Sequence, residues 1–266
     1  MNPEKLFHEF LRKKILQKGG MKPSELEDAV GKYYEEWENT PCHETDGLSP
    51  KAYYERITDA RRLVRELRDS LADGDAPPVI TERLMRLEGA DDALCDLLLD
   101  GNATEKIRLA AADLLNVRDS VPVETYIECV FDPDTPENLR ETLIGRLEEC
   151  GEKTAEPLLR RIDETEGDAK TVLAELLVYS GVRDERIYGF LIGLADDKKI
   201  LPFALDMIGR YGDERAIKKL TELARTCDYA DYTDIRNAVE MLGGELEITR
   251  DFSDDATYKK IKGEKK

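Results

Sequence analysis

Histidine, tryptophan and closely spaced cysteines are scarce in this sequence of 266 residues. The two histidines are His8 and His43, and no pair of cysteines has the short spacing that zinc ligands use. The nearest two of the five cysteines, Cys129 and Cys150, are 21 residues apart. This pattern argues against a metal site or a disulfide framework, and no cofactor is expected. It predicts cysteines that behave as small buried hydrophobes in a reducing cytoplasm.

Long apolar runs and an excess of positive charge are also missing. No stretch of about 18 apolar residues appears, and residues 1–16 lack the apolar core of a secretion signal, so neither a membrane helix nor secretion is expected. The formal net charge is −18, and residues 74–245 hold 38 Asp and Glu against 21 Lys and Arg, a difference of −17. Because nucleic-acid affinity comes largely from Lys and Arg, DNA and RNA binding are disfavoured. The acidic charge either keeps the protein soluble or attracts a basic partner.

Three amphipathic helices are predicted within residues 1–73. The first spans residues 4–17, and the second has Ser24 as its cap. The third has Ser49 as its cap and Pro50 as its first residue, and it is expected to continue without a break to residue 73. One side of this third helix is basic, through Arg56, Arg61, Arg62, Arg65 and Arg68. This basic strip is either a docking surface for an acidic partner or for the acidic repeats, or a solvated face whose arginine stems cover apolar surface.

Residues 74–247 repeat with a period of about 30 residues. Marks at Gly89, Asp119, Gly151, Gly181 and Gly212 each lie between two apolar helical stretches. Glycine there can take the left-handed conformation that lets the chain reverse. Such a period predicts an all-α solenoid, in which each helix pair buries its apolar face against its neighbours. First helices are expected at residues 80–87, 107–115, 139–147, 172–177 and 201–208, and second helices at 93–99, 121–130, 155–162, 187–194 and 216–223.

Several segments of the repeats share one motif. Ile107-Arg-Leu-Ala-Ala-Ala112 carries its first half, Met207-Ile-Gly-Arg-Tyr-Gly-Asp213 its second half, and Ala155-Glu-Pro157 the start of the second helix; Leu139-Arg140 and Ile235-Arg236 repeat its first step. These segments resemble the HEAT family, in particular the short bacterial HEAT-like repeats of the phycobilin-lyase type. That unit reads approximately Val-Arg-x-x-Ala-Ala-x-Ala-Leu-Gly-x-Ile-Gly-Asp.

The resemblance implies an armadillo-like, right-handed α-α superhelix over residues 74–247. Residues 1–73 are then expected to form an N-terminal helical cap of about three helices. Residues 248–266 are expected to be a flexible polar tail, since they are rich in charge and end in a lysine cluster.

Enzymes built on similar repeats need residues that this chain lacks. Deoxyhypusine hydroxylase holds iron through paired His-Glu motifs, whereas both histidines here lie outside the repeats. HEAT-like DNA glycosylases present a basic, aromatic groove, whereas these repeats are acidic and Trp37 is the only tryptophan. The acidic pairs Asp91-Asp92 and Asp196-Asp197 are interpreted as helix caps, and no phosphate loop or nucleophile elbow is present. No catalytic residue is assigned and an enzyme is not expected, although lyase-like activity on a pigment stays open.

The leading hypothesis is a non-catalytic scaffold or adaptor in the cytoplasm, monomeric or weakly oligomeric, that holds a basic segment of another protein. In HEAT-like stacks the second helices line the concave surface, so polar residues on their outer faces are expected to meet the partner. These residues are Glu124, Glu128, Glu156, Arg160, Tyr188 and Glu222.

The alternative hypothesis is binding of a small molecule or pigment, with lyase-like activity, in an aromatic pocket among the N-terminal helices. Aromatic side chains dominate such pockets, but they also dominate helical cores. The pocket would be formed by Tyr33, Tyr34, Trp37, Tyr53 and Tyr54.

Overall fold

The computed structural model describes residues 2–20, 22–118 and 120–263, and every regular element in these ranges is helical. They contain sixteen α-helices, two short 3-10 segments and no β-strand, which confirms the prediction of an all-α protein. The elements are α1 (Pro3–Gln17), α2 (Pro23–Glu38), η1 (His43–Thr45), α3 (Pro50–Glu55), α4 (Ala60–Asp73), α5 (Pro78–Arg86), α6 (Ala90–Leu99), α7 (Glu105–Val117), α8 (Val123–Phe131), α9 (Glu137–Glu149), η2 (Gly151–Thr154), α10 (Ala155–Leu159), α11 (Ala169–Tyr179), α12 (Glu185–Leu194), α13 (Leu201–Tyr211), α14 (Ala216–Leu223), α15 (Tyr229–Met241) and α16 (Ala256–Lys262).

The contacts of the chain cluster into two compact units. Unit 1 comprises Met1–Leu143 and unit 2 comprises Ile144–Lys266, so the boundary falls within α9. Unit 1 therefore contains the N-terminal helices together with the first repeats. The domain boundaries predicted after residues 73 and 247 describe a different division of the chain, and they stay predictions.

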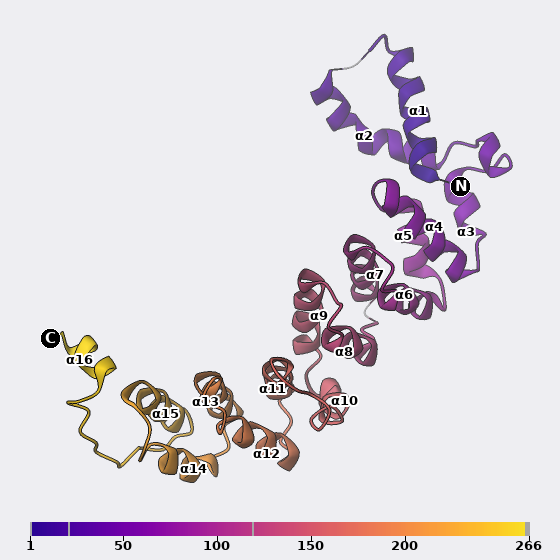
Figure 1. The fold of residues 1–266 in the computed structure, drawn as a ribbon. Coiled ribbons are helices and arrows are strands. Elements are labelled where there is room, and N and C mark those ends of the chain that lie inside the picture. Colours follow the sequence, from indigo (N-terminus) through magenta and orange to yellow (C-terminus); the bar gives the residue numbers. More distant parts are fainter. Residues whose placement is uncertain (1, 21, 119, 264–266) are drawn as a thin grey trace. The chain divides into compact units, whose positions relative to one another are not determined.

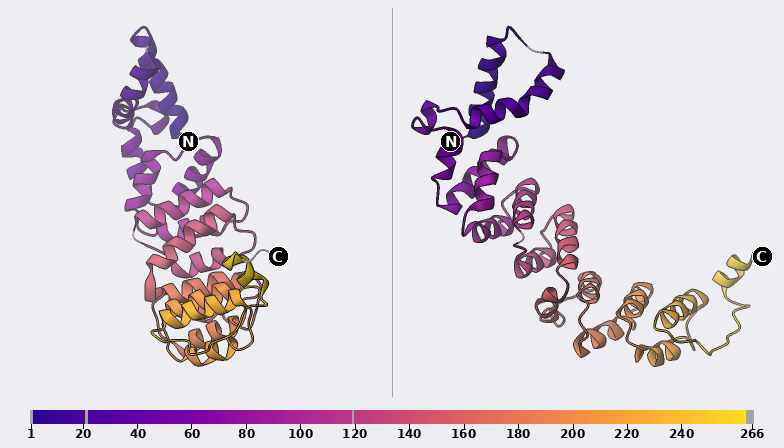
Figure 2. Two further views of the ribbon diagram at one scale, coloured as in Figure 1. Left: turned by 90° about the vertical axis from the view of Figure 1, so that its left-hand side faces the viewer. Right: turned by 180° about the vertical axis from the view of Figure 1, so that it is seen from behind.

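Within each unit, a helix packs against its neighbours in sequence and against the next helix but one. In unit 1, α4 packs on α5 and α6, and α6 packs on α7 and α8. In unit 2, α13 packs on α11, α12 and α15. Figure 1 shows the two rows that result in unit 2, with α11, α13 and α15 in one row and α10, α12 and α14 in the other, and Figure 2 shows these rows from behind. This packing is the one expected of a helical repeat.

The glycines that mark the repeat have the expected backbone conformation. Gly89, Gly151, Gly181 and Gly212 have φ angles of 73°, 55°, 71° and 72°. Gly212 is the C-cap of α13, where any residue with a Cβ would be strained. The prediction is confirmed at these four positions, while Asp119 lies outside the described residues.

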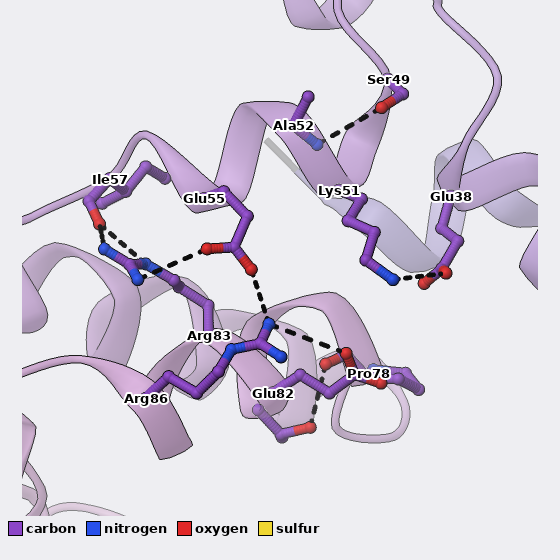
Figure 3. Close-up of polar contacts among 11 residues, drawn as sticks. Glu38, Ser49, Lys51, Ala52, Glu55, Ile57, Pro78, Glu82, Arg83 and Arg86 are labelled. Atoms are coloured by element: carbon purple, nitrogen blue, oxygen red, sulfur yellow. Dashed lines mark hydrogen bonds and ion pairs between the residues drawn. The ribbon is translucent and has the colours of Figure 1, made fainter.

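The third predicted helix is wrong as a single element, because residues 50–73 form two helices, α3 and α4. The Asp59 side chain accepts a hydrogen bond from the backbone N–H of Arg62 at 3.2 Å and thereby caps α4. From α5, the Nε and Nη2 atoms of Arg83 donate to the carbonyl oxygen of Ile57 at 3.1 and 2.9 Å. Figure 3 shows this contact beside the ion pair between Arg86 and Glu55. The side-chain partners replace the backbone bonds that a continuous helix would make.

The first three helices each begin at a proline, namely Pro3, Pro23 and Pro50. Ser49 caps α3 as predicted, since its Oγ accepts a hydrogen bond from the N–H of Ala52 at 3.3 Å. The predicted cap of the second helix is wrong, because α2 begins at Pro23 with Lys22 as its N-cap. Proline suits the first helical position, which places the cap one residue before it and not at Ser24.

Part of the segment expected to be a flexible tail is folded. Asp255 caps α16 by accepting hydrogen bonds from the N–H groups of Thr257 and Tyr258 at 2.8 and 3.0 Å. Before it, Phe252 is buried and packs on Tyr229 of α15, with ring centres 5.2 Å apart. The composition of the segment does not reveal the contact between Phe252 and Tyr229, because a single buried aromatic side chain is enough to hold a polar stretch against a helix.

Candidate functional site

The six residues predicted to meet a partner lie on or beside the second helices of both units. All are exposed except Tyr188, which is half-buried. They are Glu124 and Glu128 of α8 in unit 1, and Glu156, Arg160, Tyr188 and Glu222 in unit 2.

Two of these residues are engaged by an arginine of the following repeat. The Nη2 atom of Arg186 lies 3.2 Å from Oε2 of Glu156, and the guanidinium carbon of Arg215 lies 4.4 Å from the ring centre of Tyr188. Arg215 also pairs with Glu185 at 2.8 Å, which repeats the contact between Arg186 and Glu156 one unit later. Ion pairs within the chain therefore connect successive helices of the second-helix row of unit 2.

The same arginines neutralise the aspartates two positions before them. Hydrogen bonds from Arg186 lower the pKa of Asp184, and hydrogen bonds from Arg215 lower the pKa of Asp213. A lowered carboxyl pKa means that the surroundings stabilise the negative charge. The acidic residues at the start of α12 and α14 thus have their counter-charges inside the chain, and they offer little attraction to an external cation.

The first helices of unit 2 carry a different surface, which we call the first-helix face. It runs from the end of α9 across α11, α13 and α15, and α13 packs against both α11 and α15. Side chains four residues apart lie on one side of a helix, as Glu175 and Tyr179 do on α11. The face is defined by Glu148, Glu175, Tyr179, Asp206, Asp234 and Met241.

The α13 and α15 helices approach each other closely at Gly209. A Cβ atom on Gly209 would lie 2.9 Å from the sulfur of Met241, so the glycine leaves room for that side chain. Beside this contact, a shallow hollow of about 180 Å³ lies between the two helices, with Asp206 and Asp234 among its lining residues. Tyr179 and Met241 are 44% and 50% exposed. The first-helix face therefore combines carboxylates with accessible apolar surface.

The carboxylates of the first-helix face are only partly compensated by cations. Within the described residues, no ion pair joins Glu148, Glu175 or Asp234 to a lysine or arginine, but Asp206 pairs with Arg210 at 2.8 Å, and the nearby charge of Glu175 helps to raise the pKa of that arginine. Burial, and then the charge of Glu175, raises the pKa of Glu148. A raised carboxyl pKa means that the negative charge is poorly compensated.

A carboxyl group of α15 also has a raised pKa. Burial, and then the charge of Asp228, raises the pKa of Asp231; Lys198 lowers it, and Asp234 adds a smaller increase. Carboxylates held close together with few counter-ions attract cations from solution, and perturbed pKa values of this kind mark candidate functional surfaces. The charge pattern of α15 therefore continues that of the first-helix face.

The aromatic residues of the N-terminal helices do not form the single predicted pocket. Tyr34 and Trp37 pack on Phe7 of α1, with ring centres 5.0 and 5.6 Å from that of Phe7. Tyr53 and Tyr54 instead form a separate pair with ring centres 5.4 Å apart. Trp37 and Tyr54 are only 3% and 1% exposed, so both serve the core of unit 1, as does the buried Tyr33. The contact of Phe7 with α2 could not be predicted from the sequence, since it forms only when α1 packs against α2.

The basic strip of α4 binds acidic residues of the first repeat. Arg61 pairs with Asp96 at 3.3 Å, and Arg68 pairs with Asp100 at 2.6 Å. Of the alternatives for this strip, docking against the acidic repeats is therefore realised by two of its arginines. Arg65 keeps an exposed side chain, as the solvated-face interpretation predicts.

Other kinds of site have no counterpart in the described part of the chain. Its five cysteines are free, and none of its His, Cys, Asp and Glu side chains gather in threes as metal ligands would. None of its helices has the length and apolar character needed to cross a bilayer. Comparisons of the chain with protein-family models, with curated proteins and with solved structures give no match.

Proposed function

We propose that the protein is a non-catalytic binding scaffold that holds a basic segment of another protein on the first-helix face of unit 2. In this proposal the repeats form a HEAT-like right-handed superhelix with an N-terminal helical cap, and the protein acts in the cytoplasm. The observation that carries the proposal is the surplus of carboxylates on this face: Glu148 and Asp234 take part in no ion pair among the described residues, and burial and the charge of Glu175 raise the pKa of Glu148, so a cationic partner would neutralise them.

The choice between the two rows of unit 2 rests on where counter-charges already exist. On the second-helix row, Glu156 and Glu185 are paired with Arg186 and Arg215, so a partner would have to displace these arginines. On the first-helix face, Glu148 and Asp234 can pair with a partner without breaking an ion pair, whereas Asp206 is already paired with Arg210. The gain on binding is therefore expected to be larger on the first-helix face.

The apolar part of the face indicates what form the basic segment takes. Tyr179 and Met241 present exposed apolar side chains beside the carboxylates, and methionine adapts readily to different partners. A basic amphipathic helix carries both elements, since lysines on its flanks can pair with carboxylates while its apolar stripe covers aromatic and thioether groups. An unstructured basic tail would leave the apolar surface uncovered.

The proposal is tested with a synthetic amphipathic helical peptide of lysine and leucine, labelled for fluorescence anisotropy. In the full-length protein, the triple charge reversal Glu175→Lys, Asp206→Lys and Asp234→Lys is compared with a matched reversal on the second helices, Glu124→Lys, Glu128→Lys and Glu156→Lys. Both variants change the net charge equally. We expect the first-helix variant to lose at least about tenfold in affinity, which corresponds to three lost charge contacts of about 0.5 kcal/mol each.

The matched variant separates local recognition from general attraction. If both variants lose affinity equally, the peptide responds to net charge alone and the proposed face is wrong. If only the second-helix variant loses affinity, the partner binds the residues predicted from the family resemblance.

A further inference from the structure

A hollow beside the N-terminal helices lies between α1, α2 and the start of α5. Its volume is about 420 Å³, and its lining is mostly apolar, with Phe7 on α1, Val30 on α2, Pro77 directly before α5 and Pro78 as the first residue of α5. A volume of this size is within the range of small-molecule sites in proteins. The hollow belongs wholly to unit 1, far along the chain from the first-helix face.

The aromatic wall of this hollow is held in place by the core. Phe7 and Tyr34 meet at an interplanar angle of 67°, and both contact Trp37 behind them. The Tyr34 hydroxyl accepts a hydrogen bond from the N–H of Val79 at 3.2 Å, which ties α2 to the start of α5. The rings are therefore fixed before any ligand arrives, which reduces the entropy lost on binding.

Besides a tyrosine hydroxyl, the titratable groups of the lining are two carboxylates and one imidazole, those of Glu4, Asp75 and His8. No lysine or arginine is among the described residues that line the hollow. Asp75 pairs with Lys106 at 3.4 Å, whereas no ion pair to Glu4 occurs in this part of the chain. The Glu4 carboxylate lies against Gly74, where an added Cβ would come within 2.2 Å of it, so it is held at one edge of the hollow. The unneutralised anion of the hollow is therefore Glu4.

We propose that this hollow binds a small organic ammonium ion that carries an apolar group. The ammonium group would lie near Glu4 and the rings of Phe7 and Tyr34, whose electron-rich faces attract cations, and the apolar group would lie against Val30 and the prolines. Neutral ligands would gain only the apolar contacts, and anions would be repelled by the carboxylates.

A larger side chain at Gly31 is expected to fill the hollow. Gly31 is a lining residue within α2, and a Cβ added there meets no atom within 4 Å. The substitution Gly31→Leu therefore fills the hollow without a backbone clash, and it also replaces a poor helix former by a good one. Gly145 of α9 gives a matched control, because it is helical, has the same free space and is not among the residues that line the hollow.

The experiment uses the full-length protein and the probe benzyltrimethylammonium, with benzyl alcohol and benzenesulfonate as neutral and anionic comparators. Trp37 is the only tryptophan and contacts both aromatic lining residues, but it also lines a second hollow with Leu6 and Phe10, so a change in its fluorescence is assigned to this site only where Gly31→Leu removes it. Titration calorimetry gives the affinities. We expect the cation to bind at least about tenfold more tightly than either comparator, Gly31→Leu to abolish the fluorescence change, and Gly145→Leu to leave it unaltered.

Charge at the site is tested separately with Glu4→Gln, for which we expect an affinity loss of about fivefold. Unfolding temperatures of all variants establish that each one folds. Equal affinity for benzyl alcohol, or an unchanged affinity in Gly31→Leu, would overturn the proposal, as would the absence of binding to the unmodified protein. The triple reversal on the first-helix face should not change the affinity for this ligand. A negative result at one of the two proposed sites therefore does not contradict the other.

Discussion

Arg108 shows why an arginine recurs near the start of the first helices. Its side chain is buried, and Nε donates to the carbonyl oxygen of Leu98 at 2.7 Å while Nη2 donates to Oγ1 of Thr135 at 3.2 Å. Arg140 makes related bonds to the carbonyl groups of Asp132 and Thr135. Both arginines thus bond to carbonyl groups around the ends of the preceding second helices, where helical backbone partners run out and positive charge is favoured.

Replacing Arg108 should therefore destabilise the protein more than removing an exposed arginine. In Arg108→Met the carbonyl group of Leu98 stays buried without a donor, and we expect the free energy of unfolding in urea to fall by about 2–3 kcal/mol. Arg61→Ala is the control, because its ion pair with Asp96 is exposed and is worth less than about 1 kcal/mol. Equal losses in the two variants would contradict the role assigned to Arg108.

The backbone conformation of single residues could be predicted from the sequence, whereas their contact partners could not. The glycines at positions 89, 151, 181 and 212 were predictable, because a positive φ is a local property of one residue type. The arginine at position 108 was also visible as part of the motif, but its target was not. The carbonyl group of Leu98 becomes its partner only when α6 and α7 pack together.

At the scale of elements, the break between α3 and α4 depends on a local cap and on a distant side chain. Asp59 caps α4, and Arg83 of α5 occupies the carbonyl group of Ile57. The cap was present in the sequence as an aspartate before Ala60, but the apolar spacing ran through it and favoured a single helix. The distant contact could not be predicted, since nothing near Arg83 in the sequence indicates its acceptor.

The cap can be tested with a conservative pair of substitutions at Asp59. Asparagine caps helices about as well as aspartate, whereas alanine cannot, so Asp59→Ala should lower the free energy of unfolding by about 1 kcal/mol and Asp59→Asn by much less. Chemical denaturation of the two variants measures the difference. Similar losses in both would show that the carboxylate charge, through its weak pair with Arg65, matters more than the cap.

The surface that forms the candidate site was harder to predict than the positions of the helices. Helix positions followed from apolar spacing, but the choice of surface depends on which charges neutralise each other across repeats. The recurrence of Asp184-Glu-Arg186 as Asp213-Glu-Arg215 was the available signal, because it places an arginine near the acidic residues of the preceding unit. That signal indicates a structural use of the second-helix charges.

At the scale of the whole molecule, acidic residues outnumber basic ones by 18, and the counter-charges that exist are unevenly placed. In unit 2, ion pairs between repeats engage Glu156 and Glu185 of the second-helix row, whereas Glu148 of the first-helix face and Asp231 of α15 have raised pKa values. Net charge alone governs solubility and long-range attraction. The position of the unpaired charge decides where a cationic partner gains the most on contact.

This charge distribution predicts a pH dependence with a definite sign. A cationic peptide stabilises the charged forms of Glu148 and Asp231, so binding lowers pKa values that are raised in the free protein, and complex formation releases protons at a pH where these groups are partly protonated in the free protein. By linkage, affinity for the lysine–leucine peptide should fall as the pH is lowered from about 7 towards 4, while the peptide lysines stay charged. Calorimetry in buffers of different ionisation enthalpy measures the released protons. The triple reversal at Glu175, Asp206 and Asp234 should lose most of this release, and proton uptake by the unmodified protein would contradict the proposed face.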